Sequence, residues 1–194
     1  MKLVCLTGGI ACGKSTILNL LRDVHGFPTL EYDTIVRSIL KTADPSQIGQ
    51  MLQADVATNG RLDREKFLTA LFADRDRKTA VERALAETVW SEVETHIAMH
   101  RHARILVIES AVVFEAGLEN KFDAIITANC SDRTQLERLM RRESMTLEGA
   151  MLRIASQMPN REKAARADLV VNTDCSKAEL VPVVAQLAYF LNKL

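Results

Sequence analysis

Short apolar runs alternate with longer amphipathic stretches along this chain, and the alternation predicts a sheet covered by helices. The run KLVCLT at 2–7 predicts a buried strand, and apolar residues at helical spacing over 14–24 predict a helix after it. Further strands are predicted at 27–30, 104–108, 123–128 and 169–171. Further helices are predicted at 132–143, 146–158 and 176–192. Because helices separate the strands, we expect an α/β fold with a mostly parallel sheet flanked by helices.

A long helical stretch interrupts this alternation between the second and third predicted strands. Residues 34–98 carry no strong strand pattern, and their helical pattern is broken at Asp44-Pro45 and at Asn59-Gly60. We therefore interpret this stretch as a helical insertion into the α/β core.

Composition narrows the class of protein. The chain has 194 residues, 47% of them hydrophobic, which is enough for one domain with a buried core. Its 25 basic and 25 acidic residues cancel, so a nucleic-acid partner is not expected. The four cysteines lack metal-binding spacing. No apolar stretch has membrane-spanning length and the N-terminal run is too short for a signal peptide, so we expect a cytoplasmic protein without a membrane partner.

A glycine-rich motif joins the first predicted strand to the first predicted helix. Gly8-x-x-x-x-Gly13-Lys14-Ser15 matches the Walker A pattern of a P-loop with its full spacing, and this context disfavours a simple helix-starting turn. Glycine lets such a loop wrap closely around a polyphosphate, which bonds to backbone N–H groups at the helix N-terminus. Lys14 is expected at the β- and γ-phosphates and Ser15 on Mg²⁺. The residues expected to contact ATP are Gly8, Gly9, Ile10, Ala11, Cys12, Gly13, Lys14, Ser15 and Thr16.

The motif names no phosphate acceptor, because kinases, GTPases and motor ATPases all use it. The chain is short for a motor, and a small kinase is favoured; the tetrapeptide NKFD at 120–123 matches the N-K-x-D pattern of GTPases but ends at the start of the predicted strand at 123–128. Asp33 follows the second predicted strand and is our candidate base for an acceptor hydroxyl, with a helix N-cap as the alternative role. Glu109 follows another buried run and could hold Mg²⁺ through water or contact substrate; the alternative is an acid facing solvent. Glu115 fits a local cap or salt bridge as well as it fits a substrate contact.

Basic residues crowd the predicted helix at 132–143. Arg138 and Arg142 are four residues apart and therefore share a face. On a mobile lid, such side chains would neutralise the transferring phosphoryl group and exclude water. A solvated basic helix face is the alternative, and the pattern alone does not decide between the two.

The order of these motifs resembles that of the dephospho-CoA kinase family over nearly the whole chain. The P-loop is specific by itself, and the other segments are specific through their order and spacing. The matching segments are LTGGIACGKST (6–16), EYDTIVRSIL (31–40), GRLDREKFLTALFAD (60–74), IESAVVFEAGLENKFD (108–123), QLERLMRRESMT (135–146), RIASQ (153–157) and ADLVVN (167–172).

The resemblance implies a P-loop NTPase fold and a role for individual positions. Asp33 falls on the family's catalytic base, and Arg37 on an arginine that contacts the substrate. Arg138 and Arg142 fall on lid arginines, and Asn172 lies in the loop beside the adenine of ATP. Three regions are implied: a nucleotide-binding core (1–33, 99–132 and 161–194), a helical region for the CoA substrate (34–98) and a lid (133–160).

Two departures from the family pattern lie on the substrate side. Glu109 stands where the family commonly has Asp, without the proline that follows it there, and the His-Pro pair expected near Ala86-Glu87 is absent. The resemblance implies ATP-dependent phosphorylation of the ribose 3′-hydroxyl of dephospho-CoA by a monomer or small homo-oligomer. Another small P-loop kinase and a non-catalytic nucleotide-binding protein are the alternatives.

Overall fold

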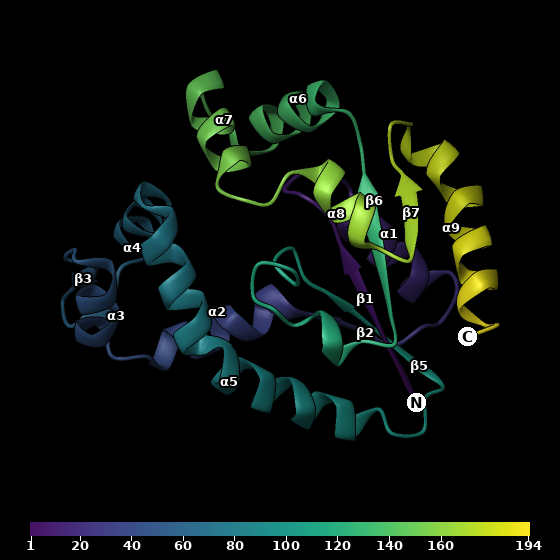
Figure 1. The fold of residues 1–194 in the computed structure, drawn as a ribbon, viewed down its shortest axis with the longest axis horizontal. Coiled ribbons are helices and arrows are strands. Elements are labelled where there is room, and N and C mark those ends of the chain that lie inside the picture. The colour runs from purple at the N-terminus through teal and green to yellow at the C-terminus, as the bar shows by residue number, and fades with distance from the viewer. The chain divides into compact units, whose positions relative to one another are not determined.

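A parallel β-sheet organises the larger of two compact units of the chain (Figure 1). The structure is a computed structural model that describes the backbone of residues 1–194 and every side chain except those of Phe72, Arg75 and Glu82. The larger unit comprises Met1–Glu31 and Ile97–Leu194. Its described strands follow the order β2-β5-β1-β6-β7 and pair in parallel. They are β1 (Lys2–Thr7), β2 (Thr29–Glu31), β5 (Ile105–Glu109), β6 (Ala124–Asn129) and β7 (Leu169–Asn172).

The central strand β1 carries the glycine-rich loop at its carboxyl end. β5 pairs with β1 on one side, with Leu6 opposite Glu109, and β6 pairs on the other, with Thr7 opposite Thr127. Because parallel strands point the same way, the segments that leave β1, β5 and β6 emerge at one edge of the sheet. Functional residues from distant parts of the sequence therefore meet at this edge.

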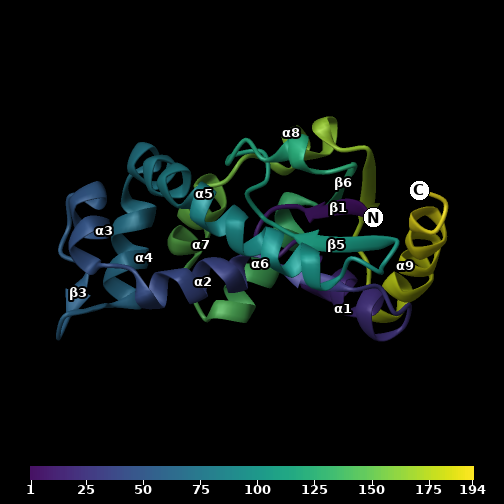
Figure 2. The ribbon, with the colours of Figure 1, turned by 90° about the horizontal axis from the view of Figure 1, so that it is seen from below.

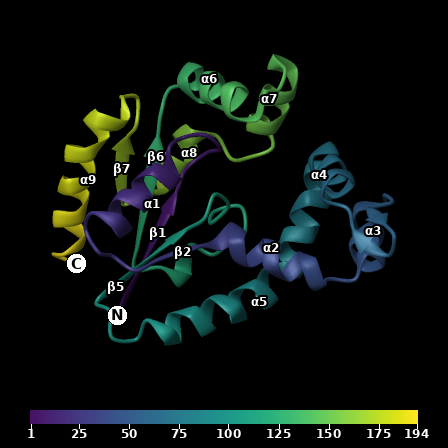
Figure 3. The same cartoon turned by 180° about the vertical axis from the view of Figure 1, so that it is seen from behind.

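Helices cover both faces of this sheet. α1 (Lys14–Asp23) and α9 (Lys177–Leu191) lie side by side on one face, as Figures 2 and 3 show. α8 (Asn160–Arg166) covers the opposite face and lies against β6. The hydrophobic core lies between the sheet and the α1–α9 pair and includes Val4, Leu6, Ile17, Leu21, Val107, Ile126, Val184 and Leu187.

Two further helices, α6 (Asp132–Glu143) and α7 (Leu147–Ala155), extend from the end of β6. Side-chain caps start both, because the hydroxyl of Ser131 accepts from the Thr134 N–H and that of Thr146 accepts from the Gly149 N–H. The prediction of one helix over 146–158 is wrong at its end. The chain leaves the helix after Ala155, and the separate helix α8 follows Pro159.

The smaller unit, Tyr32–His96, has its own apolar cluster, formed by Ile48, Leu52, Val56, Phe67 and Val81. Its helices are α2 (Tyr32–Thr42), α3 (Pro45–Leu52), α4 (Arg64–Ala73) and most of α5 (Arg75–Met99). The region is mainly helical, as the sequence pattern predicts, and β3 (Ala57–Thr58) and β4 (Arg61–Leu62) add a short hairpin that the pattern does not reveal.

The turn of this hairpin explains why the sequence pattern breaks there. Asn59 and Gly60 both have positive φ, 52° and 71°, as a two-residue hairpin turn requires.

Among the helices that the structure describes, none is both long and apolar enough to cross a bilayer.

Candidate active site

The P-loop connects β1 to α1 through a backbone that only small residues can follow. Gly8 has a φ of 138°, and a Cβ atom there would lie 2.3 Å from the carbonyl oxygen of Ala128. Gly13 has a φ of 86° and is the N-cap of α1, where it offers no side-chain cap to the helix. The first turn of α1 also contains no acidic residue. No acidic side chain of the helix itself therefore lies at its positive end, as an anion site requires.

Lys14 is a buried cation at the centre of this loop. Its side-chain nitrogen donates to the carbonyl oxygens of Gly8 and Gly9, at 3.0 Å each, and lies 3.6 Å from the Glu109 carboxylate. Glu109 is only 5% exposed at the end of β5, so its interpretation as an acid facing solvent is wrong. The side chain of Ser15 is exposed in the first turn of α1, where its hydroxyl is accessible to a ligand.

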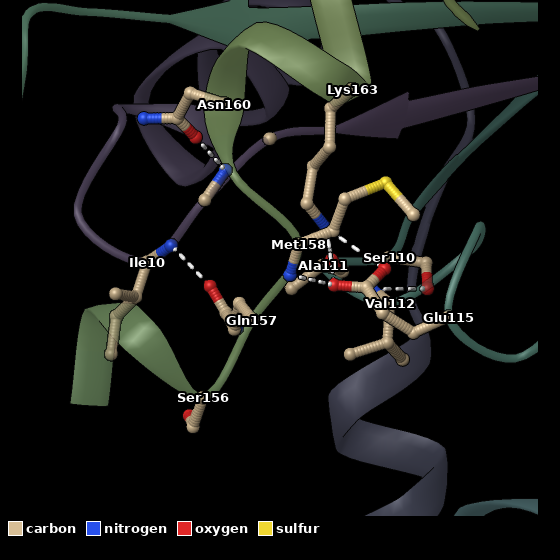
Figure 4. A network of polar contacts seen from close by, with 12 residues as sticks. Ile10, Ser110, Ala111, Val112, Glu115, Ser156, Gln157, Met158, Asn160 and Lys163 are labelled. Atoms are coloured by element: carbon tan, nitrogen blue, oxygen red, sulfur yellow. Dashed lines mark hydrogen bonds and ion pairs between the residues drawn. The ribbon is translucent and has the colours of Figure 1, made fainter. Parts of the chain in front are cut away.

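Three amide side chains, which we call the amide clasp, hold the first half of the P-loop, and Figure 4 shows two of them, Gln157 and Asn160. The Gly9 N–H donates to Asn160 Oδ1 at 3.0 Å, and the Ile10 N–H donates to Gln157 Oε1 at 2.7 Å. Gln135 Nε2 donates to the carbonyl oxygen of Ile10 at 2.9 Å, and Asn160 Nδ2 donates to Gln135 Oε1 at 2.9 Å. A Cβ atom on Gly9 would lie 2.4 Å from Asn160 and 2.6 Å from Gln135. The clasp therefore explains why glycine occupies this position.

A buried ion pair lies next to the clasp on α8. Lys163 is fully buried, and its ammonium donates to the two carboxylate oxygens of Glu115 at 2.7 and 2.9 Å, and to the carbonyl oxygen of Ala111. The N–H of Met158 also donates to Glu115, at 2.9 Å (Figure 4). Of the roles left open for Glu115, the salt bridge is the one observed.

Two thiols meet underneath the loop. The Cys130 thiol donates to Cys12 Sγ at 3.4 Å, and Asn160 Nδ2 donates to the same sulfur at 3.2 Å. The hydrogen bond from Cys130 is the largest cause that lowers the pKa of Cys12 to about 7, with nearby Lys14 adding to it. The pKa of Cys130 is raised, first because its proton is held in this bond. The four cysteines, all described, are free thiols.

Arg138 approaches the P-loop through Thr173, a residue that the sequence analysis does not single out. Its guanidinium donates to the carbonyl oxygens of Thr173 and Cys175 at 2.7 and 3.1 Å. The hydroxyl of Thr173 in turn donates to the carbonyl oxygen of Cys12 at 2.9 Å. Asn172, at the end of β7, is exposed and accepts from the Asp174 N–H. Arg138, on α6, and Asn172, at the end of β7, therefore both contact the segment 173–175 that borders the P-loop.

Arg142 stands apart from these contacts. It lies on α6, is exposed, and donates to Glu143 at 2.7 Å. The interpretation as a solvated basic helix face therefore describes the surroundings of Arg142. The side chain of Arg138, by contrast, is half-buried.

The two candidate acceptor-side residues lie in the smaller unit. Asp33 is exposed in the first turn of α2, which begins at Tyr32, so the alternative role of N-cap is wrong. Arg37 lies one turn further, where its guanidinium donates to the Asp33 carbonyl oxygen at 3.2 Å and to the Thr34 hydroxyl at 3.0 Å. These contacts leave the Asp33 carboxylate on the exposed side of the helix.

Comparison with known proteins identifies the family of this chain. The family model described as dephospho-CoA kinase matches residues 2–179. A Bacillus cereus dephospho-CoA kinase is 33% identical over 174 residues, 87% of this chain and 86% of the relative. One from Hydrogenovibrio crunogenus is 33% identical over 178 residues, 90% of each chain.

Solved structures confirm the predicted P-loop α/β fold. A Thermus thermophilus protein has a TM-score of 0.82 at 26% identity, with 100% of this chain and 97% of the other covered. The dephospho-CoA kinase from Campylobacter jejuni has a TM-score of 0.69 at 21% identity over 98% of this chain and 97% of its own. A shikimate kinase from Acinetobacter baumannii shares the fold at a TM-score of 0.54 and 17% identity, with 100% and 96% covered. This chain therefore belongs to the dephospho-CoA kinase family.

Proposed function

We propose that this chain transfers the γ-phosphoryl group of ATP to the ribose 3′-hydroxyl of dephospho-CoA, producing coenzyme A and ADP. The observation that carries the proposal is the strand–P-loop–helix unit at its N-terminus, in a chain whose family match spans residues 2–179. The P-loop supports the use of ATP, and family membership supports the acceptor.

The cradle supports binding of the triphosphate. The N-terminus of α1 and the backbone N–H groups of Gly13, Lys14 and Ser15 would face phosphate oxygens, while the N–H of Thr16 donates to the Gly13 carbonyl oxygen. Lys14 would exchange its two carbonyl partners for the β- and γ-phosphates, which are stronger, charged acceptors. Arg138 borders the same loop and would add positive charge as the phosphoryl group moves.

The donor set also fits a magnesium ion that arrives with ATP. The Ser15 hydroxyl and the Glu109 carboxylate are oxygen donors, which Mg²⁺ prefers, and it commonly takes few protein ligands beside phosphates. Among the described residues no group of three or more His, Cys, Asp or Glu side chains forms a separate metal site. When bound, Mg²⁺ would neutralise charge on the β- and γ-phosphates.

The acceptor side rests on Asp33 and Arg37. Asp33 would orient the 3′-hydroxyl and accept its proton as the oxygen attacks the γ-phosphorus and the bond to the ADP oxygen breaks. Its Cα lies two residues beyond the end of β2, hence within about 7 Å of that strand end by chain length alone. Arg37 would contact the substrate from the next turn of α2.

The remaining regions take the roles that the family pattern suggests. Residues 34–98 would hold the CoA substrate. Residues 133–160 would act as a lid that brings Arg142 toward the phosphates and excludes water, with its last residues, 157–160, staying attached to the P-loop. Asn172 would lie beside the adenine. We place the enzyme in the cytoplasm as a monomer or small homo-oligomer.

Turnover with alternative acceptors tests the function. The purified chain with Mg²⁺-ATP is assayed for ADP formation on dephospho-CoA, shikimate, gluconate, AMP and dCMP. We expect dephospho-CoA to be the preferred acceptor by a wide margin. Turnover on another acceptor alone would overturn the substrate while leaving a kinase. ATP binding without turnover on any acceptor would favour a nucleotide-binding protein.

A further inference from the structure

A short segment connects the P-loop to the loop that follows β5. We call residues 157–163 the strap; it runs from the end of α7 through the first turn of α8. Gln157 and Asn160 accept hydrogen bonds from two P-loop N–H groups, while Lys163 pairs with Glu115 on the other side (Figure 4). All of these residues belong to the larger unit. The strap therefore contacts both the P-loop and the loop that follows β5, although none of its residues belongs to the Walker A motif.

The contacts of the strap divide the N–H groups of the P-loop into two sets. Those of Gly9 and Ile10 are bonded to strap side chains. The start of α1, by contrast, has neither a side-chain cap from Gly13 nor an acid in its first turn. A bond to the strap fixes the first half of the loop and leaves the second half for an anion. The loop is thus shaped before any phosphate arrives.

The anchor of the strap is the buried ion pair. Lys163 has no exposed surface, and the side chain of Glu115 is 14% exposed. A buried charge is tolerated only when its partners are in place. Here the ammonium has three acceptor atoms, and the carboxylate also receives the Met158 N–H. The first turn of α8 is therefore held at one position relative to the loop 110–118.

We propose that Gln157, Asn160 and Lys163 are positioning residues for the phosphoryl transfer proposed above. Gln157 and Asn160 hold the P-loop in its phosphate-binding shape, and Lys163 fixes the segment that carries them. The inference rests on the proposed function for its kinetics, although phosphate binding can be tested without turnover. It assigns to Gln157 a role on ATP through the Ile10 N–H, with no contact to the acceptor.

A loop that is shaped in advance loses less entropy when it binds, so loss of the strap bond should weaken binding to phosphates. Gln157→Met keeps the length of the side chain and removes the acceptor of the Ile10 N–H. We expect the Kd and KM for ATP, and the Kd for inorganic tripolyphosphate, to rise by about tenfold, the scale of one hydrogen bond to a preformed site. The kcat, and the KM for dephospho-CoA at saturating ATP, should stay within about twofold of wild type, because the variant keeps Lys14 and Asp33.

The experiment compares wild type, Gln157→Met and a control, Ser156→Ala, by titration calorimetry with ATP and tripolyphosphate and by steady-state kinetics. The Ser156 hydroxyl donates to the Arg153 carbonyl oxygen, so this control alters the residue next to the strap and keeps the three amide side chains of the clasp. Unchanged affinity for both phosphates in Gln157→Met would overturn the proposal. A raised KM for dephospho-CoA alone would also overturn it, because it would indicate direct substrate contact.

Two further variants keep the test decisive. Asn160→Leu removes the acceptor of the Gly9 N–H and should weaken tripolyphosphate binding in the same way. It therefore provides the test if Gln157→Met fails to fold.

The double variant Lys163→Met with Glu115→Gln removes both charges of the buried ion pair together. We expect it to fold yet to bind ATP several-fold more weakly, and wild-type affinity for ATP in this variant would overturn the anchoring role of the pair. If wild type shows no turnover, the proposed function fails, whereas the tripolyphosphate titration still decides the strap.

Discussion

Glu109, the last residue of β5, and Lys14, the first residue of α1, place their charges 3.6 Å apart beside the P-loop. Both side chains are buried, at 7% and 10% exposure, so neither charge is strongly screened by water. Lys14 is also held by two P-loop carbonyl oxygens. Glu109 thus holds the lysine that the proposed function assigns to the phosphates of ATP. If the phosphates took over Lys14, the Glu109 carboxylate would become available to Mg²⁺ or substrate.

Glu109→Gln tests whether Glu109 acts in catalysis or only holds Lys14. We expect kcat to fall by about 100-fold, the scale of one lost electrostatic contact in a phosphoryl-transfer site. The Kd for ATP should stay within about threefold of wild type, because the variant keeps Lys14 and the P-loop backbone, which would contact the phosphates. Calorimetry and steady-state kinetics measure the two quantities, with the exposed-surface variant Glu137→Gln as control. A kcat close to that of wild type would show that Glu109 only holds Lys14.

Asp33→Asn tests the base on the acceptor side. The amide keeps the size of the side chain but cannot take the proton of the 3′-hydroxyl, so kcat should fall by about 100-fold to 10,000-fold. ATP affinity should not change, because Asp33 belongs to neither the P-loop nor the strap. The same preparations are titrated with ATP and assayed with dephospho-CoA. Turnover near the wild-type rate would remove Asp33 from the mechanism.

The P-loop and the core strands could be predicted because their signals are local. Apolar runs mark buried parallel strands, and the spacing from Gly8 to Ser15 marks the cradle within one segment. The hairpin at Asn59-Gly60 escaped because its strands, two residues each, are too short for an alternating pattern. Only the Asn-Gly pair signalled it, and we interpreted that pair as a break between helices.

The strap could not be predicted because its signals are neither local nor apolar. The sequence NREKAAR of α8 has the composition of a surface helix, yet its Lys163 is fully buried against Glu115. Gln157 and Asn160 bond to residues 147 and 151 positions away, a separation across which sequence spacing carries no information. Burial of a lysine follows from its partners, which only the tertiary structure brings together.

The thiol pair predicts a dependence of ATP binding on pH. The pKa of Cys12 is lowered to about 7 from its ordinary value of 9.0, first by the hydrogen bond from Cys130. As pH rises through about 7, a thiolate forms beneath the cradle and repels the phosphates. We expect ATP affinity to fall by about fivefold over this range, the scale of about 1 kcal/mol for one close charge pair near water. Calorimetry at a series of pH values measures it.

Cys12→Ser provides the control for this dependence, because it keeps the small polar side chain and removes the thiolate. ATP itself titrates in this range, so the quantity compared is the difference between wild type and variant. The free energy of unfolding of the wild type should change in the opposite direction to its ATP affinity, and rise as the pH rises. A folded-state pKa below the unfolded value contributes stability that is present above pH 9 and lost as pH falls through about 7. Identical pH profiles of wild type and Cys12→Ser would contradict the lowered pKa.

Gly8→Ala tests the close approach between the P-loop and β6. The new Cβ would lie 2.3 Å from the backbone oxygen of Ala128, which cannot rotate away as a side chain could, and φ is 138° there. We expect a loss of about 3 kcal/mol or more in the free energy of unfolding, measured by urea denaturation. Gly26→Ala is the matched control, since its φ is also positive, at 71°, but no atom lies within 4 Å of the added Cβ. It should lose only about 1 kcal/mol, from the backbone strain alone. Equal losses of unfolding free energy in the two variants would mean that the chain relaxes around Ala128. Glycine at position 8 would then be required for its positive φ and not for the close approach to the Ala128 oxygen.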